Sequence, residues 1–194
     1  NVDFRHGDIL GLGVIDDRFD YIAAGGVLHH MEDPAKGLAV LSGLLKPGGL
    51  MRLGLYSETA RQFIVAARKA IAEKNYPSTA DGIRRFRSEV ELVLDEASVR
   101  GLYGMRDYFT MSECRDLLFH VQEHRFTVPQ LKKFLDDQKL EFLKFYIRPE
   151  IEENFKKSYP EDKNFSNLDN WHGFEQKNPD TFIEMYRFWC RKVN

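Results

Sequence analysis

Two histidines and a glutamate with the spacing of a chemical site lie in the segment HVQEH. His120 and His124 are four residues apart, and Glu123 directly precedes the second histidine. On a helix, residues four apart share one face, so the two imidazoles could hold one metal ion or line one pocket. Asp116 continues the same spacing toward the N-terminus. We expect a helix here that starts at Thr110 or Ser112 and buries Leu117, Leu118 and Val121.

Two kinds of chemistry fit this stripe of residues along one helix face, which comprises Asp116, His120 and His124. In a zinc hydrolase, His120, Glu123 and His124 would bind and use the metal, as in the H-x-x-E-H pattern. That site needs a third ligand from another element, and Pro129 is expected to end the helix soon afterwards, so we expect no metal. In the favoured interpretation, Asp116, His120 and His124 position a nucleophile and take its proton. A solvated helix face is the plain alternative.

The composition is that of a globular protein: 43% of residues are hydrophobic and 30% are charged. No apolar run approaches the ~20 residues that a membrane helix needs, so we expect no membrane partner. Two isolated cysteines, Cys114 and Cys190, do not make a disulfide framework and predict a reducing, cytoplasmic setting. The net charge of −2 and the pI near 6.3 argue against nucleic acid as a partner.

The first sixty residues show the pattern of a parallel α/β sheet. Strands are expected at 2–5, 19–24 and 50–56. Between the last two lies a helix that begins with Asp33 as its N-cap and Pro34 in its first turn, and Lys-Pro-Gly-Gly stops it at residues 46–49. Strand, helix, turn, strand is a βαβ unit, and such units form parallel sheets covered by helices.

Helical spacing dominates from residue 58 to about 128, and a further helix is expected from Thr127 as its cap. Strands are predicted at 140–147 and 186–193, and short helices at 150–158 and 179–185. The large aromatic residues of the tail are expected in the core: Trp171, Phe182, Phe188 and Trp189.

The segments FRHGDI, FDYIAAGGVLHH and LKPGG, in this order, resemble the second half of a class I S-adenosylmethionine-dependent methyltransferase. The resemblance implies an α/β fold, the C-terminal portion of a Rossmann-like methyltransferase sheet with a mostly helical insertion. It implies a cofactor-side half of the core at 1–57, a helical substrate-pocket insertion at 58–139, and closing strands and helices at 140–194. It also implies S-adenosylmethionine as the cofactor and methyl transfer to an unidentified acceptor.

The same resemblance assigns roles to residues. Asp8 would lie beside the adenine. The expected cofactor-binding residues are Asp8, Ile9, Ala24, Gly25, Gly26 and His30. The expected catalytic residues are His29, Asp116, His120 and His124. The expected substrate-binding residues are Tyr56, Arg61, Arg84, Arg87 and Tyr108. For the glycines the alternative is a plain loop, for the arginines a solvated surface, and for the tyrosines ordinary packing.

The Gly-rich first loop of the family has no counterpart in this sequence, so we expect the chain to be the C-terminal part of a longer protein. A degenerate relative that has lost cofactor binding and serves as a partner-binding module is the alternative. The helical segment is similar to the C-terminal region of bacterial methyltransferases that are often joined to tetratricopeptide repeats. Such repeats are therefore an expected N-terminal neighbour in the parent chain.

Overall fold

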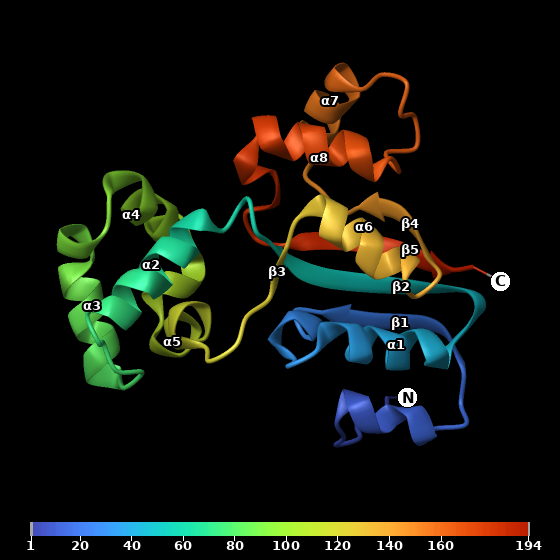
Figure 1. Ribbon diagram of the computed structural model, residues 1–194, viewed down its shortest axis with the longest axis horizontal. Coiled ribbons are helices and arrows are strands. Elements are labelled where there is room, and N and C mark those ends of the chain that lie inside the picture. Colours follow the sequence, from blue (N-terminus) through green and yellow to red (C-terminus); the bar gives the residue numbers. More distant parts are fainter. Residues whose placement is uncertain (1, 194) are drawn as a thin grey trace. The chain divides into compact units, whose positions relative to one another are not determined.

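Figure 1 shows the computed structural model, which describes residues 2–193. The chain forms two compact units. The first comprises the chain up to Ala60 together with the chain from Glu123 onward, and the second runs from Arg61 to Gln122. All strands of the described residues belong to the first unit.

The elements of the first unit are, in chain order, η1 (Ile9–Val14), β1 (Phe19–Gly25), η2 (Leu28–His30), α1 (Pro34–Leu44), β2 (Leu45–Ser57), β3 (Arg125–Phe126), α6 (Val128–Asp136), β4 (Leu140–Phe145), α7 (Pro149–Ser158), α8 (Leu168–Lys177), η4 (Pro179–Phe182) and β5 (Tyr186–Lys192). Its sheet has the strand order β1-β2-β5-β4. β1 and β2 are parallel, whereas β5 runs antiparallel to both β2 and β4. The two-residue β3 pairs in parallel with the end of β2. This confirms the predicted α/β fold with a final antiparallel pair.

One face of the sheet forms the core of the unit. Leu53, Phe188 and Phe145 occupy matching positions on β2, β5 and β4, and all are buried. Helices α1, α6, α7 and α8 supply the other side of this core, and Trp171 of α8 stacks on Phe155 of α7 with ring centroids 3.7 Å apart.

The opposite face of the sheet, called here the outer face, presents Tyr21, Leu50, Arg52 and Trp189. Tyr21 is 46% exposed and stacks on Trp189 at 5.6 Å between ring centroids. Trp189 is partly exposed, so the expectation that it belongs to the core is wrong, whereas Trp171, Phe182 and Phe188 are buried as expected. Strand alternation explains the difference, because Phe188 and Trp189 are neighbours and must face opposite sides.

The βαβ unit forms as predicted, with one adjustment. Asp33 caps α1 by accepting hydrogen bonds from the amides of Ala35 and Lys36. The Lys-Pro-Gly-Gly turn lies inside β2 as a bulge, where Phe19 pairs with Leu45 but Tyr21 pairs with Leu50. Gly48 takes φ +75° there, which only glycine adopts readily.

Two sequence-based expectations about elements are wrong. Residues 2–8 form no strand, and Val2 and Phe4 are 76% and 93% exposed. A strand needs a neighbour for its backbone groups, and none of the described strands lies beside this segment. In the tail, the expected helix at 179–185 is only the short η4, while α8 lies between the two expected helices, where none was predicted.

The second unit is wholly helical in its regular structure and has its own core. It contains α2 (Gln62–Glu73), α3 (Ala80–Val93), α4 (Glu96–Tyr103), η3 (Arg106–Phe109) and α5 (Met111–Phe119). Thr79, Asp95 and Thr110 cap its helices with side-chain oxygens. Ile64 and Phe86 are fully buried in its core.

The two tryptophans give a direct test of the two faces of the sheet. We expect Trp171→Ala to lower the free energy of unfolding by about 3–5 kcal/mol, because it leaves a cavity under α7 and α8. Trp189→Ala removes only a partly exposed stacking pair and should cost about 0.5–1.5 kcal/mol. Urea unfolding of both variants measures the difference, and equal losses would contradict a solvent-facing outer face.

Candidate functional site

The carboxyl ends of β1 and β2 meet at one end of the sheet. Gly25 ends β1 and Gly26 follows it, while Tyr56 and Ser57 end β2. The amide of Gly26 donates to the carbonyl oxygen of Gly54 at 3.2 Å and holds the two strand ends together. In open α/β sheets, small ligands bind outside the carboxyl ends of parallel strands, so this end is the candidate site.

Three glycines shape the backbone here. A Cβ on Gly54 would lie 2.7 Å from the Met185 sulfur, 3.1 Å from the Gly26 amide nitrogen and 3.2 Å from Gly25 Cα, so a larger residue here would crowd both Met185 and the backbone of β1. Gly26 has φ +76°. A Cβ on Gly25 would meet no atom within 4 Å, so open space lies directly against its backbone. The strand end therefore has room for a ligand that must approach the main chain closely, as the resemblance requires of the cofactor.

An aromatic cluster of His29, His30 and Tyr56 lies at the same end. The His29 ring lies 3.8 Å from the Tyr56 ring and 4.3 Å from the His30 ring, between centroids, and His29 is fully buried. The two histidines come from η2, the turn that follows β1, and the tyrosine comes from β2. The structure thus brings together three residues that the sequence suggested for different roles.

The segment after Gln122 adds charged groups to this end of the sheet. The amide of His124 donates to the His29 carbonyl oxygen at 2.8 Å, and Arg125 pairs with Tyr56 in the β2–β3 ladder. The Arg125 guanidinium lies 2.8 Å from a Glu58 oxygen and 3.4 Å from a Glu123 oxygen. The Glu123 side chain is only 1% exposed. Glu58 and Arg125 were missed at the sequence level because their proximity depends on β3, which is too short to give a periodic signal.

The predicted stripe of Asp116, His120 and His124 does not exist. Helix α5 ends at Phe119, His120 has extended backbone angles, and Val121 is 97% exposed instead of buried. His120 Nδ1 lies within 3.2 Å of both the amide nitrogen and the carbonyl oxygen of Gln122. This local contact competes with helical hydrogen bonding and ends the helix.

The helical premise of the zinc interpretation is therefore wrong as well. His120 and His124 do not share a helix face, and they fall in different compact units. Among residues 2–193, no group of three or more histidine, cysteine, aspartate or glutamate side chains is arranged to hold a metal ion.

The remaining candidates are spread over both units. In the second unit, Arg87 lies over the Tyr108 ring at 5.4 Å, and burial raises the Tyr108 pKa to about 12. Arg84 is exposed and pairs with Asp81, while Arg61 is buried. Their substrate-binding roles stay predictions, as does the catalytic role of the exposed Asp116.

At the start of the first unit, Asp8 caps η1 by accepting from the Leu10 amide at 2.9 Å. Ile9 packs against the core, and η1 contacts α1. The predicted contact of Asp8 and Ile9 with the adenine stays a prediction.

A buried hydrogen-bond network of Ser57, Glu175 and Tyr186 was missed by sequence analysis. All three residues are fully buried. The Ser57 hydroxyl donates to Glu175 Oε1 at 2.6 Å, and the Tyr186 hydroxyl lies 2.8 Å from both Glu175 oxygens. Glu175 lies four residues after the buried Trp171, so its place on the inner face of α8 could have been found once that helix was predicted.

Burial raises the pKa of the Glu175 carboxyl, because desolvation penalises the charged form. The hydroxyls of Ser57 and Tyr186 and the nearby His172 imidazole oppose this shift without cancelling it. Burial likewise raises the pKa of the Tyr186 hydroxyl.

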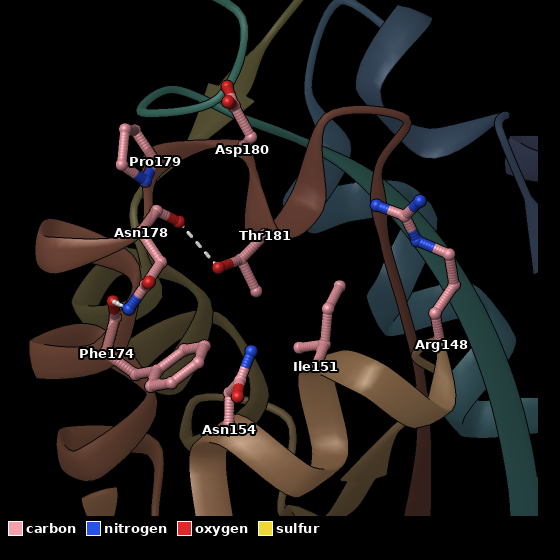
Figure 2. Close-up of a pocket in the computed structure, with 8 residues that line it drawn as sticks. All are labelled: Arg148, Ile151, Asn154, Phe174, Asn178, Pro179, Asp180 and Thr181. Atoms are coloured by element: carbon pink, nitrogen blue, oxygen red, sulfur yellow. Dashed lines mark hydrogen bonds between the residues drawn. The ribbon is translucent and has the colours of Figure 1, made fainter.

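Figure 2 shows a cavity of about 240 Å³ elsewhere in the first unit, between α7, the end of α8 and η4. Its lining includes Arg148, Ile151, Asn154, Phe174, Asn178 and Thr181. Asn178 and Thr181 are tied together by a hydrogen bond from the threonine hydroxyl to the Asn178 carbonyl oxygen. None of the residues predicted from the sequence to form a site lines this cavity.

Comparisons with known proteins agree with the fold. Residues 1–53 match the family described as methyltransferase domain. An uncharacterized protein of Synechococcus sp. is 30% identical over 158 residues, which cover 76% of this chain and 37% of the relative. The structure of PKMT2 from Rickettsia typhi superposes with a TM-score of 0.66 at 12% identity, covering 96% of this chain and 37% of that one. The same protein in complex with AdoHcy gives a TM-score of 0.54.

The first 53 residues therefore carry sequence of the methyltransferase-domain family, and the likeness to PKMT2 supports a partial Rossmann-like methyltransferase fold. The family match covers β1, η2, α1 and residues 45–53 of β2, and it ends just before the β2 residues of the strand-end site, Gly54, Tyr56 and Ser57. The chain spans a little over a third of the length of these relatives. No helix in the described part of the chain is long and apolar enough to cross a membrane.

Gly54 tests the close approach of the strands. We expect Gly54→Ala to cost about 1–3 kcal/mol of unfolding free energy, because the added methyl group meets the Met185 sulfur and presses on the backbone at Gly25 and Gly26. Gly43→Ala is the matched control: its Cβ meets open space on α1, and it should stabilise the chain by up to about 1 kcal/mol. Urea denaturation measures both. Similar behaviour of the two variants would contradict the described strand contact.

Glu175 makes stability depend on pH. Because its pKa is raised in the folded state, the folded protein keeps a proton that the unfolded chain releases above the ordinary value of 4.5. This contribution is complete below pH 4.5 and is lost as the pH rises toward the raised value. We expect stability to fall through that window in the unaltered protein and not in Glu175→Gln. Urea titrations across the range measure this, with the exposed Glu153→Gln as control, and parallel curves for all three proteins would contradict the assignment.

Proposed function

We propose that this chain supplies the cofactor-side end of the sheet in an S-adenosylmethionine-dependent methyltransferase. The observation that carries the proposal is the glycine-lined end of β1 and β2, which has open space against Gly25. Its β1 side, with Gly25 and Gly26, lies in the segment that matches the methyltransferase-domain family. The Rickettsia protein of the same fold has been seen with AdoHcy, which supports the choice of cofactor.

The cofactor, when bound, supplies an electrophilic methyl group on a sulfonium. The chain's own contribution is to hold and orient the reactants and to exclude water. Gly25 and Gly26 would let the cofactor approach the backbone, with Ala24 and His30 beside them and Asp8 and Ile9 at the adenine. The aromatic face of Tyr56 suits a neighbouring cation. His29, and His124 whose amide binds the His29 carbonyl oxygen, would serve as proton acceptors for a methyl acceptor that must lose a proton.

We further propose that the chain works as part of a longer protein. Among the described strands none pairs with the second edge of β1, and the outer face leaves Tyr21 and Leu50 exposed. Parallel strands in α/β proteins are normally covered on both faces. The relatives extend over more than half of their length beyond the matched region. Tetratricopeptide repeats remain the proposed N-terminal neighbour, and the cytoplasm the proposed location.

A second candidate function is a methyltransferase-like module that binds a partner without catalysis. The outer face favours it, because the stacked pair of Tyr21 and Trp189 is an apolar surface suited to a protein contact. The two functions differ in whether the strand-end site takes the cofactor.

Calorimetric titration with S-adenosylhomocysteine distinguishes them. The ligand is titrated into this chain and into a version that carries about 60–80 additional upstream residues, roughly two further strand–helix units. We expect binding by the extended version. In that version Gly25→Leu should weaken binding at least about tenfold, equivalent to ~1.4 kcal/mol, because the side chain fills the open space at the strand end.

Gly43→Leu is the matched control, since it adds the same side chain at an exposed position of α1. It should leave the affinity unchanged. Absence of binding in both versions would reject the cofactor role and favour the partner-binding module. Equal affinities for the two leucine variants would move the cofactor site away from Gly25.

A further inference from the structure

The buried network of Ser57, Glu175 and Tyr186 lies directly beneath the candidate site. Ser57 is the last residue of β2 and follows Tyr56, a member of the aromatic cluster. Glu175 reaches this point from α8, which is 118 residues away along the chain, and Tyr186 reaches it from the start of β5. Three elements of the first unit therefore meet at the carboxyl end of β2.

Ser57 connects this network to the turn that follows β2. Its Oγ accepts a hydrogen bond from the Ala60 amide at 3.0 Å while its hydroxyl proton points to Glu175 at 2.6 Å. A serine hydroxyl has one proton and rotates freely without a partner, so the acceptor on Glu175 fixes which lone pair faces Ala60. Glu175 and the Ala60 amide together hold the Ser57 hydroxyl, so Ser57 links the turn at residues 57–60 to Glu175.

The same turn carries the charged side of the site. The Glu58 amide donates to the Phe126 carbonyl oxygen at 2.8 Å, and the Glu58 carboxylate binds Arg125. Residues 56–58 are held on one side by β3 and from beneath by Glu175 through Ser57. A shift of Ser57 would move Tyr56 and Glu58 together.

Packing alone does not explain a glutamate at this place. Burying a carboxyl group costs free energy, and hydrophobic residues of similar volume often stabilise such positions better. The neighbours of Glu175 on the inner face of α8 are apolar, Trp171 and Phe174. Glu175 is fully buried, and the hydroxyls of Ser57 and Tyr186 hold it at the end of β2. Such a satisfied polar network indicates that the backbone at this strand end must keep one fixed geometry.

We propose that Glu175 is a positioning residue, which acts through Ser57 to fix the turn at residues 57–60 and so places Tyr56 and Glu58 at the strand-end site. That these two residues serve methyl transfer rests on the proposed function; that Glu175 positions them does not. The groups that face the carboxyl group are the Ser57 and Tyr186 hydroxyls and the His172 imidazole.

Amide hydrogen exchange and amide chemical shifts of the ¹⁵N-labelled chain test the proposal. In Glu175→Leu we expect the Ala60 amide to exchange at least about tenfold faster, because the Ser57 hydroxyl loses the acceptor that holds it in place beside Ala60. The amide signals of Tyr56, Ser57 and Glu58 should shift with it. Ser57→Ala should produce the same local changes, since it removes the Ala60 acceptor itself.

Two further variants separate positioning from mere stability. Glu175→Gln keeps an oxygen that accepts from Ser57, so it should restore Ala60 protection to within about threefold of the unaltered protein. Tyr186→Phe removes the other hydroxyl but leaves the Ser57 contact, so it should lower global stability while Ala60 stays protected. Leu131→Val on α6 is the matched core control, and it should change exchange without singling out the turn.

Several results would overturn the proposal. Unchanged Ala60 exchange and Tyr56 shifts in a folded Glu175→Leu would make Glu175 a core residue only. If that variant fails to fold, protected Ala60 in Ser57→Ala, or lost protection in Glu175→Gln, leads to the same conclusion. Failure of S-adenosylhomocysteine binding with the expected exchange pattern would reject the methyltransferase proposal alone, and binding with an unaltered pattern would reject the positioning role alone.

Discussion

The contact of β1 with the middle and end of β2 is the constraint on which the site depends. Parallel strands place their carboxyl ends side by side, and here Gly54 lets the backbone of Gly25 and Gly26 come close enough to hydrogen-bond. Everything at the candidate site is attached to these two strand ends: η2 continues from β1, and the turn at residues 57–60 continues from β2. β3 then joins the two by pairing with Tyr56 and by the bond from the His124 amide to the His29 carbonyl oxygen.

Local signals were sufficient to predict most of the sheet. The strand at 19–24, the cap at Asp33 and the strands near 140 and 186 all depend on residues close in sequence, and all formed as predicted. The failures have a different origin. The strand expected at 2–5 has the right pattern but no neighbour. Helix α5 ends early because His120 contacts the backbone of Gln122, which outweighs a weak helical preference.

Only part of the candidate site could be predicted from the sequence, because the rest is formed by long-range contacts. His29, His30 and Tyr56 follow strand ends and could be found by position. Their stacking could not, since ring geometry depends on how η2 folds over β2. Glu175 and Arg125 reach the site from elements more than 60 residues beyond β2, and nothing in their local sequence indicates a partner. They were missed because their partners lie far away along the chain.

The sheet exposes apolar side chains on its outer face and buries a polar group on its inner face. On the outer face, aromatic rings are left in water, although their burial against another layer would release about 25 cal/mol per Å² of apolar surface. On the inner face, a carboxyl group is buried at a cost although an apolar residue could fill the space. Neither choice benefits the first unit as a separate folded body. Both are explained if, as we propose, further protein covers the outer face and the end of β2 must keep one fixed geometry for its ligand.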